Sequence, residues 1–334
     1  MRLLAVFLAG LVLVGASAAA DQVGAARAYL ERLEKLPEDF AFGRFEPTPG
    51  IVLETGRLAA RGPSRGTVVF VPGYTAPLEL YAQEMRALAE AGWDVAALVL
   101  RGQGRSVRLA TRYDLGHVRD YANLTADLAA FVARQEGPIV VVGLSQGAHV
   151  ALRMAADYAP EVLAYALIVP MIGIPGGRVG RGVADLLARN GAAGAYLPGS
   201  LPWPRRTPFT RLVGRGNVCQ PDADLANLRR ALMEVDPDLR VEVPSAGWVS
   251  ATFASIDVLE RIGPSVEAPV LMVTAGRDRV VSSRAAGRLC ARMSDCREVR
   301  LPGAPHCAVE GDARRSPVVM EAVTGFLARE SAAR

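Results

Sequence analysis

Short apolar runs, each bounded by glycine, proline or charged residues, alternate along this chain with segments of helical periodicity. The apolar runs have the length and composition of buried strands and occupy residues 67–71, 138–142, 166–169 and 269–275. Helical patterns accompany them, the first near residues 23–36 and the last near residues 318–327. This alternation predicts an α/β fold in which a mostly parallel central sheet carries helices on both faces.

One long stretch, at about residues 171–255, interrupts the alternation and is rich in glycine, proline and arginine. We predict that it forms a cap, inserted into a core made of residues 21–170 and 256–334. The chain has 334 residues, of which 51% are hydrophobic, so its size is consistent with one large core that carries an insertion.

The first twenty residues have a different pattern from the rest. Met1 and Arg2 precede the almost wholly apolar segment 3–14, and small residues with an A-x-A site follow up to Asp21. This pattern predicts a secretory signal peptide over residues 1–20 and a mature chain that begins near Asp21. We therefore expect a periplasmic or secreted protein, with retention as an uncleaved membrane anchor as the alternative.

The five residues Gly143–Gly147 read Gly-Leu-Ser-Gln-Gly, directly after the apolar run at 138–142 and before a helical segment. They match the G-x-S-x-G nucleophile elbow, in which a buried strand turns sharply into a helix. Small residues two positions before and after the serine permit the strained turn and the close passage of neighbouring chain. The pattern predicts that Ser145 is a nucleophile held above the edge of the sheet.

A catalytic serine needs a base, and the chain contains three histidines. His149 lies one helical turn beyond Ser145, where a histidine of the helix face or core is expected. His117 precedes both the elbow and its strand. His306 follows the strand-like residues 297–301, which places it at the carboxyl end of a late strand, where open α/β sheets bind ligands. We predict that His306 is the base.

The acid that orients this histidine is predicted to be Asp278, because it follows the buried-strand pattern that ends at residue 275. The chain order Ser145, Asp278, His306 is the one expected of α/β-hydrolases.

Two backbone N–H groups are predicted to hold the oxyanion. One belongs to Gln146, which follows the nucleophile, and the other to Tyr74, in the Pro-Gly turn after the strand at 67–71.

With these residues in place, the chain resembles the serine α/β-hydrolases that include monoacylglycerol lipases and bacterial lysophospholipases of the L2 type. The similar segments are Val71–Tyr74, Leu100–Ser106, Gly116–Tyr121, Asp127-Leu128, Pro244–Val249, and Gly303–His306 followed by Glu310. Pro72 stands where the family usually carries a histidine, and Val99 stands where it carries an aspartate. The resemblance implies the α/β-hydrolase fold, a Ser-His-Asp mechanism and an ester substrate.

All four cysteines lie in the predicted mature chain, which agrees with export to an oxidising compartment. Cys290 and Cys296 are six positions apart and could close a small disulfide, leaving Cys219 in the cap to reach Cys307 beside His306. Four cysteines permit three pairings, and we predict two disulfides without choosing among them. No Cys/His spacing matches a zinc site, and the predicted mechanism needs neither a metal nor an organic cofactor.

The predicted cap is strongly basic. Between residues 171 and 220 there are seven arginines and a single acid, Asp185, which is a local net charge of +6. Aromatic residues lie among or just beyond the arginines, and we predict that Trp203, Phe209 and Trp248 contact substrate. Arginines interleaved with apolar side chains suit a lipid–water interface, although a solvated basic face is the plain alternative. The export signal and the lack of any recognition motif argue against nucleic acid.

Taken together, the motifs predict an exported serine hydrolase that cleaves carboxylic esters, with fatty-acyl esters of glycerol or lysophospholipids as the expected substrates. An acyltransferase and a proline-iminopeptidase-like peptidase on the same triad remain alternatives, as does a catalytically inactive binding protein of this fold.

Overall fold

The computed structural model describes residues 22–31, 33–110, 112–175, 177–198, 200 and 216–333. The predicted signal peptide and the predicted substrate contacts Trp203 and Phe209 lie outside the described residues.

A single large sheet organises the described chain. Its eight strands run in the order β1 (Ala41–Phe45), β2 (Leu53–Leu58), β4 (Asp94–Leu98), β3 (Thr67–Val71), β6 (Ile139–Leu144), β7 (Ala164–Ile168), β9 (Val270–Ala275) and β10 (Cys296–Leu301). The pairs β1–β2 and β2–β4 are antiparallel, and every pair from β4 to β10 is parallel. The predicted mostly parallel sheet is confirmed, and parallel strands place all their carboxyl ends at one edge.

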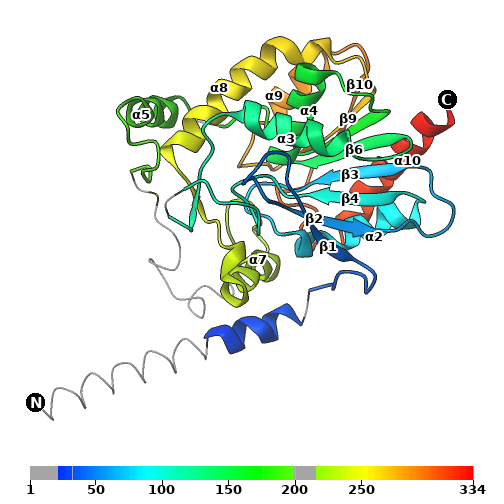
Figure 1. The fold of residues 1–334 in the computed structure, drawn as a ribbon, viewed down its shortest axis with the longest axis horizontal. Helices are drawn as coiled ribbons and strands as arrows, with labels where there is room; N and C mark the ends of the chain where they lie inside the picture. The colour runs from blue at the N-terminus through cyan, green and yellow to red at the C-terminus, as the bar shows by residue number, and fades with distance from the viewer. Residues whose placement is uncertain are drawn as a thin grey trace, which may run out of the picture.

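Helices cover both faces of the sheet, as Figure 1 shows. One face carries α2 (Ala82–Glu90) and α10 (Ser316–Ala332), and the other carries α3 (Tyr121–Val132), α4 (Gln146–Tyr158), α8 (Ala246–Ile262) and α9 (Ser283–Cys290). The strand β3 shows why its sequence is a continuous apolar run. Val68 and Phe70 pack in one core, while Val69 and Val71 pack in the other, so no position faces water.

The ends of the chain differ slightly from the pattern-based expectation. The helix expected near 23–36 ends at residue 30, where the N–H of Leu33 bonds to the carbonyl of Leu30 in a tighter turn. The C-terminal helix extends beyond the expected 318–327 to Ser316–Ala332. No helix in the described part of the chain has the length and apolar character needed to cross a membrane.

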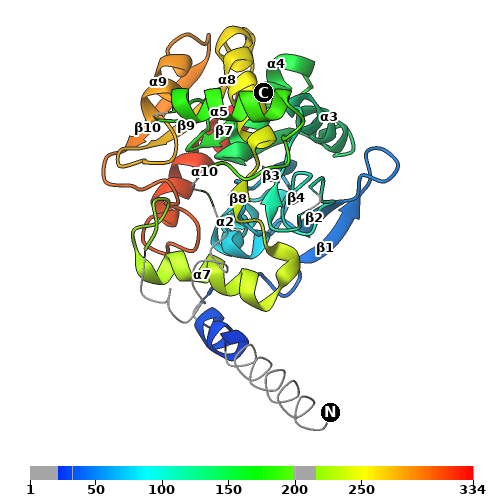
Figure 2. The same ribbon diagram turned by 90° about the vertical axis from the view of Figure 1, so that its left-hand side faces the viewer.

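The segment predicted as a cap contains α5 (Gly177–Arg189), α7 (Ala223–Val235) and the short strand β8 (Val243–Pro244), which pairs with β5 (Leu115–Gly116). Short 3-10 turns lie at Leu78–Tyr81, Pro237–Leu239 and Gly263–Ser265. The N-terminal helix at residues 22–30 lies beside α7 in both views, and the Tyr29 hydroxyl donates to Asp224 there at 2.7 Å (Figures 1 and 2). Helix α8 runs through residue 255, the expected end of the insertion.

A glutamate is buried between the two helices of one face. Glu84 on α2 is fully buried and accepts a hydrogen bond from the hydroxyl of Ser316, at the start of α10. Its second carboxyl oxygen has no hydrogen-bond partner among the described residues. Burial, with the nearby carboxylates of Glu310 and Glu34 as lesser causes, raises the pKa of Glu84 to about 8.

This pKa makes stability depend on pH in a defined direction. In the unfolded chain Glu84 ionises near pH 4.5, whereas in the folded protein it stays protonated up to about pH 8. Stability is therefore fully present below pH 4.5 and is lost as pH rises towards 8, by a few kcal/mol in order of magnitude. We expect Glu84→Gln to remove this loss, so that urea unfolding at pH 5 and pH 8 differs less in the variant than in the wild type. An identical difference in both proteins would contradict the buried, protonated state.

Candidate active site

The residues expected to carry chemistry lie at one edge of the sheet because the parallel strands before them end there. Ser145 follows β6, Asp278 follows β9, His306 follows β10 and Tyr74 follows β3. Strand β6 pairs with β3, and β9 pairs with β10, so residues far apart in sequence meet at this edge.

The turn at Ser145 has the strained geometry of a nucleophile elbow. Ser145 has φ 50° and ψ −109°, a left-handed conformation that is uncommon for a residue with a side chain. A Cβ on Gly143 would lie 2.7 Å from the Cα of Ala148, and a Cβ on Gly147 would lie 2.3 Å from the carbonyl oxygen of Val71. Both neighbours are backbone atoms, so only glycine fits at these two positions.

The structure brings Ser145, His306 and Asp278 into one line of hydrogen bonds. The Nδ1 atom of His306 lies 2.7 Å from Asp278 Oδ2, and its Nε2 atom lies 2.9 Å from Ser145 Oγ. With the Nδ1 proton donated to the carboxylate, Nε2 is free to accept the proton of the serine hydroxyl. The side chains of His306 and Asp278 are only 6% and 2% exposed, so the pair is screened from water.

The carboxylate of Asp278 is itself held in place. Its Oδ1 atom accepts hydrogen bonds from the backbone N–H groups of Val280 and Val281, both at 2.8 Å. Two donors on one oxygen leave the other oxygen aimed at the imidazole, which fixes the orientation of the ring.

The two predicted oxyanion donors lie beside the serine. Gln146 is the first residue of α4, so its N–H has no acceptor within the helix. The turn that contains Tyr74 passes close by, since a Cβ on Gly73 would lie 3.4 Å from the Cβ of Ser145. The arrangement places both N–H groups where they can reach a carbonyl bound at Ser145.

The other two histidines have structural surroundings. His149 is fully buried on α4, with Nδ1 2.8 Å from the carbonyl oxygen of Met171 and Nε2 2.7 Å from the hydroxyl of Ser255. Burial lowers the pKa of His149 to about 4, so it stays neutral. His117 lies 2.8 Å from the hydroxyl of Ser245, and burial lowers its pKa as well. Neither ring takes part in the line of hydrogen bonds to Ser145.

Of the three predicted aromatic contacts, Trp248 alone is among the described residues. It is buried at the start of α8 and packs against the ring of Tyr74, with the ring centroids 4.7 Å apart. The insertion therefore forms the back of the oxyanion turn.

Two contacts near the site carry no local sequence signal. Gln146 donates through Nε2 to the hydroxyl of Tyr121, which lies 2.9 Å from the hydroxyl of Thr252 on α8. Arg229 on α7 donates to Thr75, the residue after Tyr74. The partners of Arg229 lie 81 or more positions away in the sequence, so no periodicity or motif links them.

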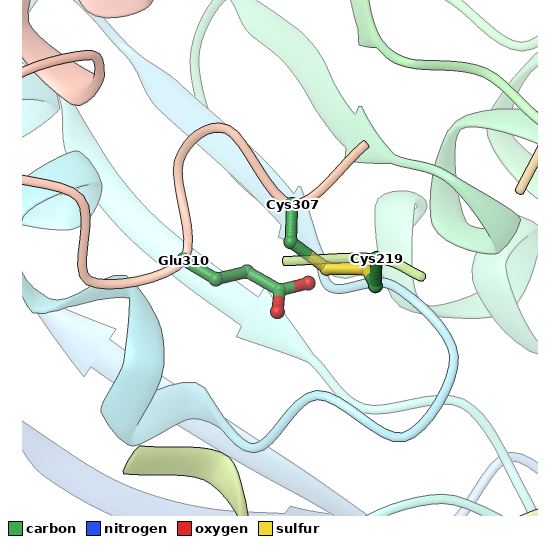
Figure 3. Close-up of side chains that lie close together, drawn as sticks. All are labelled: Cys219, Cys307 and Glu310. Atoms are coloured by element: carbon green, nitrogen blue, oxygen red, sulfur yellow. A yellow bond between two sulfur atoms is a disulfide. The ribbon is translucent and has the colours of Figure 1, made fainter. Parts of the chain in front are cut away.

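Both predicted disulfides are present in the structure, as Cys219–Cys307 and Cys290–Cys296. Figure 3 shows the carboxylate of Glu310 turned towards the Cys219–Cys307 bridge. Sulfur, sulfur and carboxylate could suggest a metal site, but both sulfur atoms are engaged in the covalent bond. The carboxylate oxygens of Glu310 accept instead from Tyr81 and Arg229.

Comparison with known proteins places this geometry in a family. Residues 62–310 match the family model Hydrolase_4, described as serine aminopeptidase, S33. The lysophospholipase L2 of Escherichia coli (strain K12) is 29% identical over 282 residues, which cover 79% of this chain and 81% of that protein.

Solved structures share the fold at lower identity. A soluble variant of monoglyceride lipase from Saccharomyces cerevisiae has a TM-score of 0.68 at 17% identity, covering 89% of this chain and 96% of its own. The monoacylglycerol lipase of Paleococcus ferrophilus has a TM-score of 0.63 at 19% identity, covering 83% of this chain and 99% of its own. These likenesses confirm the α/β-hydrolase fold.

Proposed function

The chain belongs to the serine aminopeptidase S33 family of α/β hydrolases, and on that premise we propose that it cleaves fatty-acyl esters of glycerol or of lysophospholipids through Ser145. It is an ester hydrolase of the group that resembles lysophospholipases and monoglyceride lipases. The observation that carries the catalytic proposal is the continuous line of hydrogen bonds from Asp278 through His306 to Ser145.

In the proposed mechanism, the Oγ atom of Ser145 attacks the ester carbonyl while Nε2 of His306 takes the hydroxyl proton. Asp278 stabilises the resulting imidazolium, and the N–H groups of Gln146 and Tyr74 bind the oxyanion. His306 then returns the proton to the leaving alcohol, which yields an acyl-enzyme. Water, deprotonated by His306, attacks the acyl carbonyl and releases the fatty acid.

Support for lipid esters comes from the names of the relatives. The curated relative is a lysophospholipase, and the solved neighbours include lipases and a membrane phospholipase A. The family description names an aminopeptidase, so a peptidase on the same triad is the second candidate.

We expect Ser145→Ala and His306→Ala to lower turnover of a p-nitrophenyl ester by about 10³-fold or more, because each removes one member of the proposed triad. A fluorophosphonate probe should label the wild type and leave Ser145→Ala unlabelled. Activity near the wild-type level in either variant would overturn the assignment.

The same assay distinguishes the substrate classes. Faster hydrolysis of long-chain than of short-chain p-nitrophenyl esters supports the lipid proposal. Exclusive use of acetate, or faster cleavage of aminoacyl amides, would contradict it and favour the alternatives.

We further propose that α5 contacts a lipid surface. Val179, Val183 and Leu186 are spaced three and four positions apart, so they share one face of the helix, and they are 79%, 36% and 64% exposed. Helix α5 lies at the outer side of the molecule in Figure 1. An exposed apolar helix face in a basic segment suits insertion at the boundary between headgroups and acyl chains.

The double substitution Val179→Ser and Leu186→Ser should weaken co-sedimentation with phosphatidylglycerol vesicles roughly tenfold, because the apolar area available for insertion falls. Val318→Ser is the matched control, since Val318 is 54% exposed on α10, and it should bind as the wild type does. Melting temperatures establish that the variants are folded. Equal binding by the double variant and the control would refute the role of α5.

Export is the third part of the proposal. It rests on the charged start, apolar segment and A-x-A site within residues 1–20, and two disulfides agree with an oxidising compartment. Protein expressed from the full-length gene in a Gram-negative host should appear in the periplasm or medium with an intact mass that begins near Asp21. Recovery of the full-length chain in the cytoplasm with free thiols would contradict export.

A further inference from the structure

Arg229 belongs to α7, within the segment predicted as a cap, yet its guanidinium reaches two loops that surround Ser145. Its Nη1 atom donates to the hydroxyl of Thr75 at 2.7 Å, and its Nη2 atom donates to the carboxylate of Glu310. Nη2 also lies 3.6 Å from the Sγ atom of Cys307, next to His306. The side chain is 20% exposed, so the guanidinium is committed to these partners rather than to water.

The first partner, Thr75, has a conformation that its own chemistry disfavours. Thr75 has φ 61°, in the left-handed region, where a β-branched residue is an outlier. Two side chains hold it there: the amide oxygen of Gln103 accepts the Thr75 N–H at 2.8 Å, and Arg229 donates to its hydroxyl. Because Thr75 directly follows Tyr74, the conformation of Thr75 sets the direction of the turn that presents the Tyr74 N–H.

The second partner, Glu310, connects the same turn from another side. Its Oε1 atom accepts a hydrogen bond from the hydroxyl of Tyr81 at 3.2 Å. That hydroxyl would lie 3.6 Å from a Cβ on Gly73, so it borders the turn just before Tyr74. The carboxylate therefore joins Arg229 to Tyr81, and the two cationic and phenolic donors flank the turn.

The segment leading into α7 cannot shift independently of the histidine loop. The Cys219–Cys307 disulfide ties them covalently, and the N–H of Cys307 bonds to the carbonyl of Cys219 at 3.1 Å. Gln220 adds a side-chain bond to the carbonyl of Cys307 at 2.9 Å. Figure 3 shows Glu310 beside this bridge, so the anchor and the acceptor of Arg229 form one cluster.

We propose that Arg229 is a positioning residue for the oxyanion turn: it holds Thr75 in its left-handed conformation, so that the Tyr74 N–H faces the reacting carbonyl. The cap thereby contributes to stabilisation of the transition state and not only to enclosure of the substrate. This inference rests on the proposed function, because it assumes that the Tyr74 N–H binds the oxyanion formed at Ser145.

The test compares Arg229→Gln, Thr75→Val and the double variant in hydrolysis of a p-nitrophenyl ester. Each single substitution removes the same hydrogen bond, so each should lower kcat roughly tenfold to a hundredfold and leave KM within about threefold. The double variant should be no slower than the slower single variant, because the bond is lost only once. Thr75→Ser keeps the hydroxyl and should retain most of the activity.

The matched control is Arg314→Gln. Arg314 also pairs with an acid at α7, Asp222, at 3.1 Å, but its side chain is 74% exposed and far from the oxyanion turn in its contacts. This variant should keep the wild-type kcat. Affinity for a boronic acid, which mimics the tetrahedral intermediate, should fall in Arg229→Gln by the same factor as kcat/KM.

Several outcomes would overturn the inference. Wild-type kcat in Arg229→Gln, additive losses in the double variant, or a rise in KM alone would each exclude a positioning role. If Arg229→Gln lacks a folded melting transition, Thr75→Val and Thr75→Ser still decide the question. Fluorophosphonate labelling separates the two levels: failure to label Ser145 in the wild type refutes the proposed function, whereas equally fast labelling of the wild type and Arg229→Gln refutes only this inference.

Discussion

The close approach of α4 to the end of β3 is the constraint on which the site depends. Gly147 packs so tightly that a Cβ there would lie 2.3 Å and 2.5 Å from the carbonyl oxygens of Val71 and Pro72. This contact brings the start of the elbow helix against the oxyanion turn, and it sets the Gln146 N–H beside the Tyr74 N–H. The strain at Ser145 is tolerated because buried strands on both sides leave the turn no room to relax.

Polar contacts carry this rigidity outward from the sheet. The hydroxyl of Thr252 donates to the carbonyl of Trp248, so Tyr121 donates to Thr252 and accepts from Gln146. The chain of bonds therefore joins α3, α4 and α8 directly behind the oxyanion position. A buried network of this kind favours one arrangement, because each group left unpaired would lose a hydrogen bond without access to water.

The segment between β7 and β9 is thus more than a cover over the site. Trp248 supports Tyr74 through ring packing, and Arg229 reaches the turn from the other side. The disulfide at Cys307 anchors this segment next to His306. Parts of it therefore bear on the geometry of the reaction, while α5 presents an apolar face away from the core.

Local pattern alone was enough to predict the α/β fold, because apolar runs of strand length and helical periodicity reflect burial directly. It also singled out Ser145, Asp278 and His306, since each follows a strand and parallel strands share one carboxyl edge. The disulfide pairing, the left-handed Thr75 and the reach of Arg229 could not be predicted in this way. They depend on which distant segments meet, and such contacts are decided by the packing of the whole chain, which leaves no periodic trace in the sequence.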